Sequence, residues 1–335
     1  MNKGTQQGSW FFRIHRKAAG AALGLGIVLA PAVVASRSVQ AQTFSLLYTF
    51  TGGMDGSTPV GGASGYGTVF KLDTTGKETV LHSFSGAGGD GAFPLGGVVR
   101  DEQGNLYGTT EVGGTSNCGT VFKLDTTGKE TVLYSFAGMG GDGRSPWAGV
   151  VRDGQGNLYG TTVGGGVSDL GTVFKVDTTG KETVLHSFTG TVVDGAQPMT
   201  GLVLDTKGNL YGTTNSGGRG IEGGNGVVFK VSKAGLETVL YRFPANGAKG
   251  IDPRGVVRDA QGNLYGSTLF HGAFGWGTVF KRAPTGKLTV LYNFTGGNAD
   301  GGDPYAGVVQ DSQGNLYGTT SAGAIGYGTV FKITP

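Results

Sequence analysis

The sequence predicts an all-β protein, a β-propeller of four-stranded blades, on three observations. A unit of about 52 residues recurs along the chain. Each unit holds four short runs of β-branched and aromatic residues, which are typical of strands. Gly, Pro, Asn and Asp, the residues of tight turns, separate these runs. Four strands in a unit of this length match one propeller blade, and no segment after the first 41 residues has a helical period.

The four strands, A to D, are read from four recurring strings. They are Pro-x-x-Gly-Val-Val-x-Asp (Pro94–Asp101), Gly-Asn-Leu-Tyr-Gly (Gly104–Gly108), Gly-Thr-Val-Phe-Lys (Gly119–Lys123) and Thr-Val-Leu-(His/Tyr)-x-Phe (Thr131–Phe136). Successive copies of the Phe in strand C lie 52, 52, 55, 51 and 51 residues apart. Since consecutive strands alternate in direction, the short A–B and C–D turns share one face of the propeller. The long, Gly-rich B–C and D–A loops share the other face, the long-loop face.

The first 41 residues are predicted to be a signal peptide, and residues 42–335 the propeller domain. Basic residues, an apolar stretch at Ala18–Ala35 and small residues at Val39–Ala41 follow one another as in a secretory leader. The alternative is an uncleaved membrane anchor. No other segment is apolar enough to span a bilayer, so we expect an exported chain: periplasmic, surface-located or extracellular.

One of the predicted blades is truncated. Residues 67–84 hold strands C and D alone, because an A–B hairpin of about 25 residues is missing. The full blades are expected at about 94–136, 146–188, 198–243, 253–294, and 304–335 completed by a D-like strand at 44–50. The half blade can take a sixth position, or the strand ending at Phe84 can close a five-bladed ring; the sequence allows both.

Charge and cysteine content narrow the classes of partner. Residues 1–41 carry five basic and no acidic residues, so the mature chain has 21 basic and 23 acidic residues and a net charge of −2. Without a basic stripe, a nucleic-acid partner is not expected. A single cysteine, Cys118, allows no internal disulfide, so stability must come from a packed core. We expect a monomer.

The blade pattern resembles two known groups of proteins. Pro94–Tyr107, followed by two further strands, is similar to the blades of NHL-repeat and gluconolactonase-like propellers. Gly-Gly-x-x-x-x-x-Gly-Thr-Val-Phe (Gly113–Phe122) resembles the GloVer tandem-repeat family, the "choice-of-anchor" exported bacterial proteins, and the resemblance covers about 44–335. That resemblance implies an exported repeat protein of unknown function, often with a C-terminal anchor. This chain departs from it by ending at Pro335.

Two kinds of aspartate recur, and turn chemistry explains both. The Asp of Asp-x-x-Gly-Asn, as at Asp101, should cap the A–B turn. The Asp-Gly pairs of the D–A loops suit Asx turns, with a Ca²⁺ site as the alternative, although one carboxylate per blade is dispersed for an ion that takes six to eight oxygens. These metal candidates are Asp55, Asp90, Asp142, Asp194 and Asp300. No other cofactor is predicted.

Histidine and cysteine give no catalytic pattern. His82 and His186 occupy a strand D position that is Tyr in other repeats, so they are interpreted as packing residues. Cys118 occupies a variable loop position and is expected to be inert. No nucleophile elbow or Ser/His/Asp order is present.

Residues that break the repeat on the long-loop face are the candidate ligand-binding residues. Exposed aromatic side chains on loops of a rigid scaffold suit a carbohydrate or peptide, whereas the alternative is that they fill gaps between blades. The candidates are Trp147, Trp276, Phe270, His271, Phe274, Tyr305, Arg144, Arg219 and Arg254, with Tyr66, Tyr327 and Glu222 nearby.

The leading functional hypothesis is a non-enzymatic binding protein for a glycan, peptide or envelope component. The first alternative is a gluconolactonase-like hydrolase with a divalent metal in a central channel. The second is a purely structural surface protein.

Overall fold

The computed structural model describes residues 61–219, 224–297, 300–323 and 328–334, and every regular element in these ranges is a β-strand. No helix of the length and hydropathy needed to cross a bilayer occurs among them. The proposed leader, the strand at 44–50, Asp55, Glu222 and Tyr327 lie outside the described residues.

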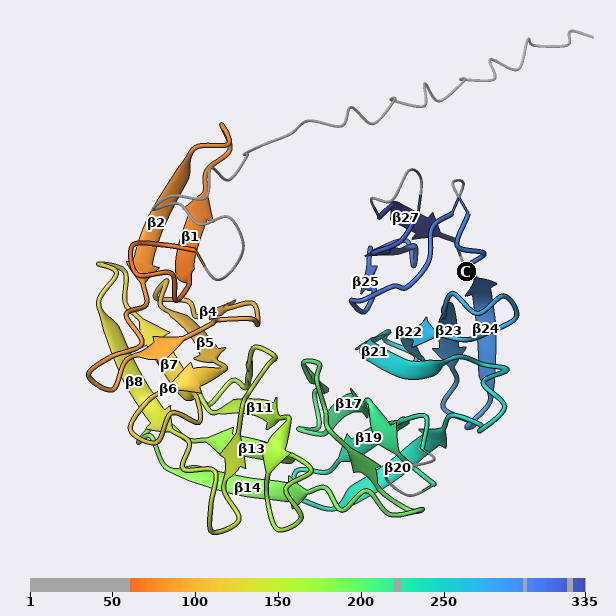
Figure 1. The fold of residues 1–335 in the computed structure, drawn as a ribbon, viewed down its shortest axis with the longest axis horizontal. Helices are drawn as coiled ribbons and strands as arrows, with labels where there is room; N and C mark the ends of the chain where they lie inside the picture. The colour runs from red at the N-terminus through yellow and green to blue at the C-terminus, as the bar shows by residue number, and fades with distance from the viewer. Residues whose placement is uncertain (1–60, 220–223, 298–299, 324–327, 335) are drawn as a thin grey trace, which may run out of the picture. The chain divides into compact units, whose positions relative to one another are not determined.

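Four sheets have the predicted four strands in the order A-B-C-D, all antiparallel (Figure 1). The first is β4 (Val99–Arg100), β5 (Leu106–Thr110), β7 (Thr120–Leu124) and β8 (Glu130–Ser135). The next is β10 (Val151–Arg152), β11 (Leu158–Thr162), β13 (Thr172–Val176) and β14 (Glu182–Ser187). The third is β16 (Val203–Leu204), β17 (Leu210–Thr214), β19 (Val227–Val231) and β20 (Glu237–Arg242). The fourth is β21 (Ile251–Arg258), β22 (Leu264–Phe270), β23 (Thr278–Arg282) and β24 (Leu288–Asn293).

Two sheets have fewer described strands. The truncated unit at 67–84 forms a C–D hairpin of β1 (Thr68–Leu72) and β2 (Glu78–Ser83). The last repeat supplies β25 (Val309–Gln310), β26 (Leu316–Thr319) and β27 (Val330–Ile333), in that order. The fourth strand of the last blade was predicted at 44–50, so its place, and the blade number, stay predictions.

The long loops contain small sheets that the sequence analysis did not predict. In three blades the D–A loop pairs with the B–C loop of the same blade. These two-residue strands are β3 (Gly91–Ala92) with β6 (Val112–Gly113), β9 (Gly143–Arg144) with β12 (Gly164–Gly165), and β15 (Gly195–Ala196) with β18 (Ser216–Gly217). In the next blade the same pairing is continuous with β21 and β22, where Ile251 faces Phe270. A Cβ at Gly113 would collide with the backbone of Asp90 and Gly91, which explains the repeated glycine.

A series of phenylalanine pairs packs each sheet against the next. The Phe that follows strand D meets the Phe of strand C in the following blade edge-on. Buried Phe136, for example, meets buried Phe174 at a centroid distance of 5.0 Å. The equivalent pairs are Phe84–Phe122, Phe188–Phe229, Phe243–Phe280 and Phe294–Phe331. Neighbouring blades therefore share one repeated apolar core, because each sheet needs a cover on both faces.

Candidate functional site

The short-turn face repeats one hydrogen-bond network. In the turn between β4 and β5, the Asp101 carboxylate accepts hydrogen bonds from the backbone and side-chain amides of Asn105 and from the Tyr107 hydroxyl, at 2.8, 2.8 and 2.9 Å. Burial opposes ionisation, but these donors outweigh it and lower the pKa of Asp101 to about 2. The same bonds recur at Asp153, Asp205, Asp259 and Asp311. The proposed capping role accounts for all of these contacts.

The aspartates of the D–A loops also hold their own loops. Oδ2 of Asp142 accepts from the Ala137 amide at 2.6 Å and the Tyr134 hydroxyl at 3.0 Å, while Oδ1 accepts from the Gly143 amide at 2.6 Å. The carboxylates of Asp90, Asp194 and Asp300 accept comparable loop bonds. Each of the four candidates within the described residues is thus engaged in its own loop, as the Asx-turn interpretation expects. A Ca²⁺ site that joins them stays a prediction.

Two of these aspartates stand beside a histidine and a glutamate. Within the described residues, the groups with metal-ligand chemistry are His82–Asp90–Glu130 and His186–Asp194–Glu237. Sequence reasoning interpreted the histidines as packing residues, and each ring does contact the neighbouring Phe edge-on, at 4.7 Å. It missed the glutamates, because these come from strand D of the following blade.

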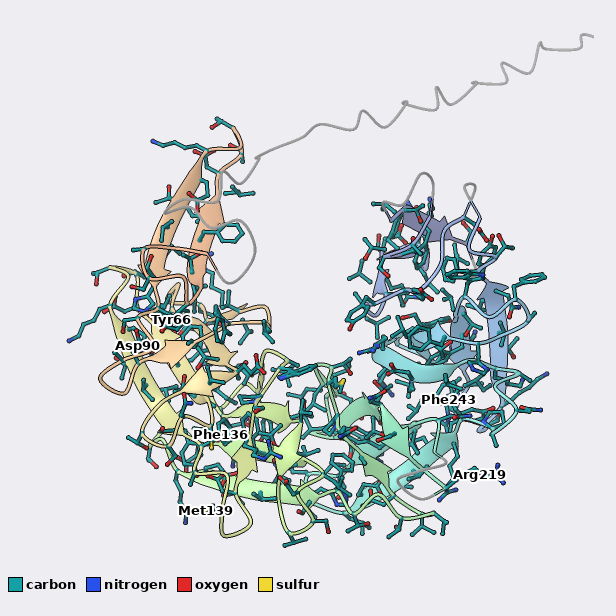
Figure 2. The ribbon with its side chains drawn as sticks, in the orientation of Figure 1. Tyr66, Asp90, Phe136, Met139, Arg219 and Phe243 are labelled. Atoms are coloured by element: carbon teal, nitrogen blue, oxygen red, sulfur yellow. The ribbon has the colours of Figure 1, made fainter. Side chains whose placement is uncertain are left out.

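Two aromatic candidates on the long-loop face pack against glycines. The Tyr66 ring, labelled in Figure 2, covers Gly86 in the loop that precedes β3. The Trp276 ring covers Gly296. A Cβ on either glycine would contact the ring closely. For these two rings the structure favours the gap-filling role, although each keeps 41% of its surface exposed. Phe270 and Phe274 lie nearby in the chain and are 42% and 60% exposed.

Trp147 and Arg144 each contact a carboxylate. The half-buried Trp147 donates from Nε1 to Glu111 Oε1 of the preceding blade, at 3.0 Å. The Arg144 guanidinium makes two hydrogen bonds of 2.8 Å to Asp169, and together with the Gly165 amide these lower the pKa of Asp169 to about 2. Both contacts join loops, so these two side chains stabilise the long-loop face.

A repeated backbone feature positions the residue that follows each loop proline. The residue before the proline has a positive φ of 53–59°, which is rare for a side-chain-bearing residue. Its amide donates to a carbonyl of the B–C loop of the preceding blade, as Ser145 donates to Cys118. The five such residues are Phe93, Ser145, Gln197, Asp252 and Asp303. The residues after the prolines are Leu95, Trp147, Met199, Arg254 and Tyr305.

Arg254 and Tyr305 meet at this repeated position, and Asp252 joins them. The Arg254 guanidinium lies 4.7 Å from the Tyr305 ring centroid and donates to Asp252 at 2.6 Å. Arg254 is 6% exposed, and its buried Nε has no hydrogen-bond partner among the described residues. Burial raises the pKa of Asp252 to about 6, against the opposing effect of Arg254. Tyr305 keeps 65% of its surface exposed, so this Arg254 cluster presents one open aromatic ring on a rigid base.

The remaining candidates differ in placement. His271 has a φ of +66° and forms a β-bridge with Trp276, and its ring leaves no room for a Cβ at Gly247. Arg219 is exposed (Figure 2). Cys118 is half-buried, with its Sγ 3.4 Å from the Ser116 carbonyl and against Gly138.

Comparison with known proteins identifies the family. The model of the Gloeobacter/Verrucomicrobia repeat matches residues 41–245 and 219–335. The chain belongs to this repeat family. A search of curated proteins with the sequence of this chain found no match.

Among the similar solved structures, puromycin hydrolase shares the fold of this repeat protein. Puromycin hydrolase is 14% identical at a TM-score of 0.51; the match covers 82% of this chain but only 41% of that one. A candidate gluconolactonase is 15% identical at a TM-score of 0.41, over 64% of this chain and 71% of that one. The PQQ-bound aldose sugar dehydrogenase of Streptomyces coelicolor is 14% identical at 0.43, over 72% and 82%. With the repeated four-stranded sheets, the fold is the predicted propeller type.

Proposed function

We propose that the chain is an exported, non-enzymatic binding protein whose long-loop face takes a glycan. The observation that supports this most is the open ring of Tyr305, 65% exposed and stacked on the buried, ion-paired Arg254. An aromatic ring held on a rigid base loses little conformational entropy on binding and offers a flat apolar surface to the C–H face of a sugar.

The surroundings of that ring also suit a neutral ligand. Arg254 is paired with Asp252, and Arg144 with Asp169, so neither guanidinium is free for an anion. Phe274, 60% exposed in the B–C loop of the preceding blade, is a second ring of the same face. A peptide or another envelope component is the alternative that the experiment separates from a glycan.

The test compares exposed residues of the two faces. Purified chain is applied to a glycan array and to an immobilised envelope extract, as wild type and as Tyr305→Ala, Phe274→Ala and Leu236→Ala. Leu236 is 71% exposed in a C–D turn and serves as the control on the short-turn face. We expect Tyr305→Ala to weaken glycan binding at least tenfold and Leu236→Ala to leave it unchanged. Equal binding by all variants would show that the ligand does not bind on the long-loop face. If the chain bound only the protein components of the envelope extract and no glycan on the array, the ligand would be a peptide.

A further inference from the structure

Side chains from neighbouring blades converge at two equivalent places, away from the Arg254 cluster. His82 and Asp90 come from one unit and Glu130 from the next; two blades further on, His186 and Asp194 meet Glu237. In each group the three donor atoms lie within 4.8 Å of one another. We propose that each group binds one Zn²⁺ ion between two neighbouring blades. This inference goes beyond the binding function proposed for the long-loop face.

The fold presents each imidazole in a fixed orientation. Strand D carries a bulge opposite the Val–Phe pair of strand C, so that His82 faces Val69 while Phe70 faces Val80. The His82 ring then contacts buried Phe84 at 78° and the His186 ring contacts Phe188 at 84°. The buried Nε2 of His82 has no hydrogen-bond partner among the described residues, so in the tautomer protonated on Nδ1 its lone pair is available to a metal.

The aspartates are oriented by donors from their own loop. Oδ2 of Asp90 accepts from the amide and the hydroxyl of Ser85, and Oδ1 from the Gly91 amide, all at 2.7 Å. Asp194 has the same arrangement with Thr189 and Gly195, and its Oδ1 lies 3.2 Å from His186 Nε2. Hydrogen bonds of this kind hold a ligating carboxylate in position and sustain metal affinity.

Each glutamate adds a second carboxylate to its group, against the aspartate of the facing loop. Oε1 of Glu130 and Oε1 of Glu237 are buried without a hydrogen-bond partner among the described residues, as is Oε1 of Glu182 in the group that has tyrosine in place of histidine. A second carboxylate placed against a first one needs either a proton or a cation between them.

The donor set selects the metal. Ca²⁺ takes six to eight oxygen ligands, whereas one imidazole nitrogen and two carboxylate oxygens suit Zn²⁺, with a fourth position for water. Zn–ligand distances of about 2.0 Å require ligand atoms roughly 3.3 Å apart. The donor atoms now lie within 4.8 Å of one another, so metal binding requires them to draw closer together. A neutral imidazole and two carboxylates also balance the charge of the ion.

The chain contains its own comparison site. Tyr134, Asp142 and Glu182 occupy the same positions one blade later, and there the Tyr134 hydroxyl donates to Asp142 at 3.0 Å. At a further junction Lys249 replaces the aspartate and donates to the carbonyl of Leu288, which replaces the glutamate. Of these equivalent groups, only those with a histidine offer an imidazole nitrogen to a metal.

The test counts Zn²⁺ ions by competition with a chromophoric chelator, on the purified full chain. We expect two ions per wild-type chain, one in His82→Tyr, one in His186→Tyr and none in the double variant. Tyrosine is the residue of the equivalent position in the neighbouring blade, so these variants should fold, which circular dichroism checks. Tyr134→His should gain a third ion. The control His271→Gln should keep two ions.

A second readout separates binding from a trivial loss of structure. Zn²⁺ should raise the Tm of the wild type and leave the Tm of the double variant unchanged, while both have the same Tm in chelator. The proposal is wrong if the wild type binds no Zn²⁺, if the double variant binds as many ions as the wild type, if Ca²⁺ competes equally, or if Tyr134→His gains nothing.

Discussion

The two faces of the sheets differ in how strictly they repeat. At the short-turn face, Asp153 receives the same bonds from Asn157 and Tyr159 as its counterparts receive in four other repeats. At the long-loop face, the position after the loop proline is Trp147 in one blade and Arg254 in another, with different partners. The comparison shows that these hydrogen bonds of the short A–B turns are the same in every described blade that has this turn. Variation is confined to loops that a rigid scaffold supports, where binding residues are usually found.

The largest expected effect comes from removing a short-turn aspartate. Asp153→Ala deletes the acceptor of four hydrogen bonds, from Gln155, Asn157 and Tyr159, and leaves partly buried donors unpaired. We expect the free energy of unfolding to fall by about 3 kcal/mol. Urea denaturation measures it. Asp153→Asn keeps an acceptor oxygen and should lose about 1 kcal/mol.

The matched change on the long-loop face should cost less. Arg144→Met breaks a bidentate ion pair whose side chains are 43% and 61% exposed, so we expect a loss of less than about 1 kcal/mol. If Arg144→Met and Asp153→Ala destabilised the protein equally, the contrast between the two faces would be lost.

An intermediate effect on stability is expected at Glu182, where the loop that carries Asp142 approaches strand D of the following blade. Burial, and then the carboxylate of Asp142, raise the pKa of Glu182 to about 7. The folded chain therefore holds a proton that the unfolded chain releases at lower pH, and stability falls as the pH rises from about 4.5 through about 7. Glu182→Gln should raise the free energy of unfolding by about 1 kcal/mol at pH 8, allowing for solvent screening, and change nothing at pH 4.

Denaturation of wild type and variant across this pH range measures the effect. A stability difference that stayed constant from pH 4 to pH 8 would contradict the raised pKa of Glu182.

The smallest expected effect on stability is at the proposed ligand ring. Tyr305 is 65% exposed and Arg254 keeps its partner Asp252, so Tyr305→Ala should change the free energy of unfolding by less than about 0.5 kcal/mol. Tyr265→Ala, at a ring that is 4% exposed, should cost several times more than Tyr305→Ala. A large loss in Tyr305→Ala would assign that ring to the scaffold and weaken the functional proposal.

Much of the fold could be predicted because its signals are local. The strings around Leu106, Val121 and Leu133 became strands B, C and D, and the Asp-x-x-Gly-Asn turn formed the capped turn that its residue types favour. The small sheets of the long loops were not predicted. Two residues such as Gly91 and Ala92 are too few for a periodic pattern, and they pair with a loop about 20 residues away.

The candidate site was predicted in part. The sequence singled out Arg254 and Tyr305 as departures from the repeat, but not that one stacks on the other. It also gave no role to Asp252. Trp276 and Tyr66 were candidates for the same reason as Tyr305, and only packing against Gly296 and Gly86 separates them from it.

The sequence by itself determined the family, the blade, its strand order and its short turns, since each depends on residues within one 52-residue unit. Only the tertiary structure decided which side chains of successive units meet. Glu130 lies beside His82, and Phe174 beside Phe136, because one twisted sheet packs on the next in a particular offset. Strand propensity and turn chemistry act over a few residues and carry no information about that offset. The contacts between blades, where both proposals lie, therefore come from the packing of whole sheets.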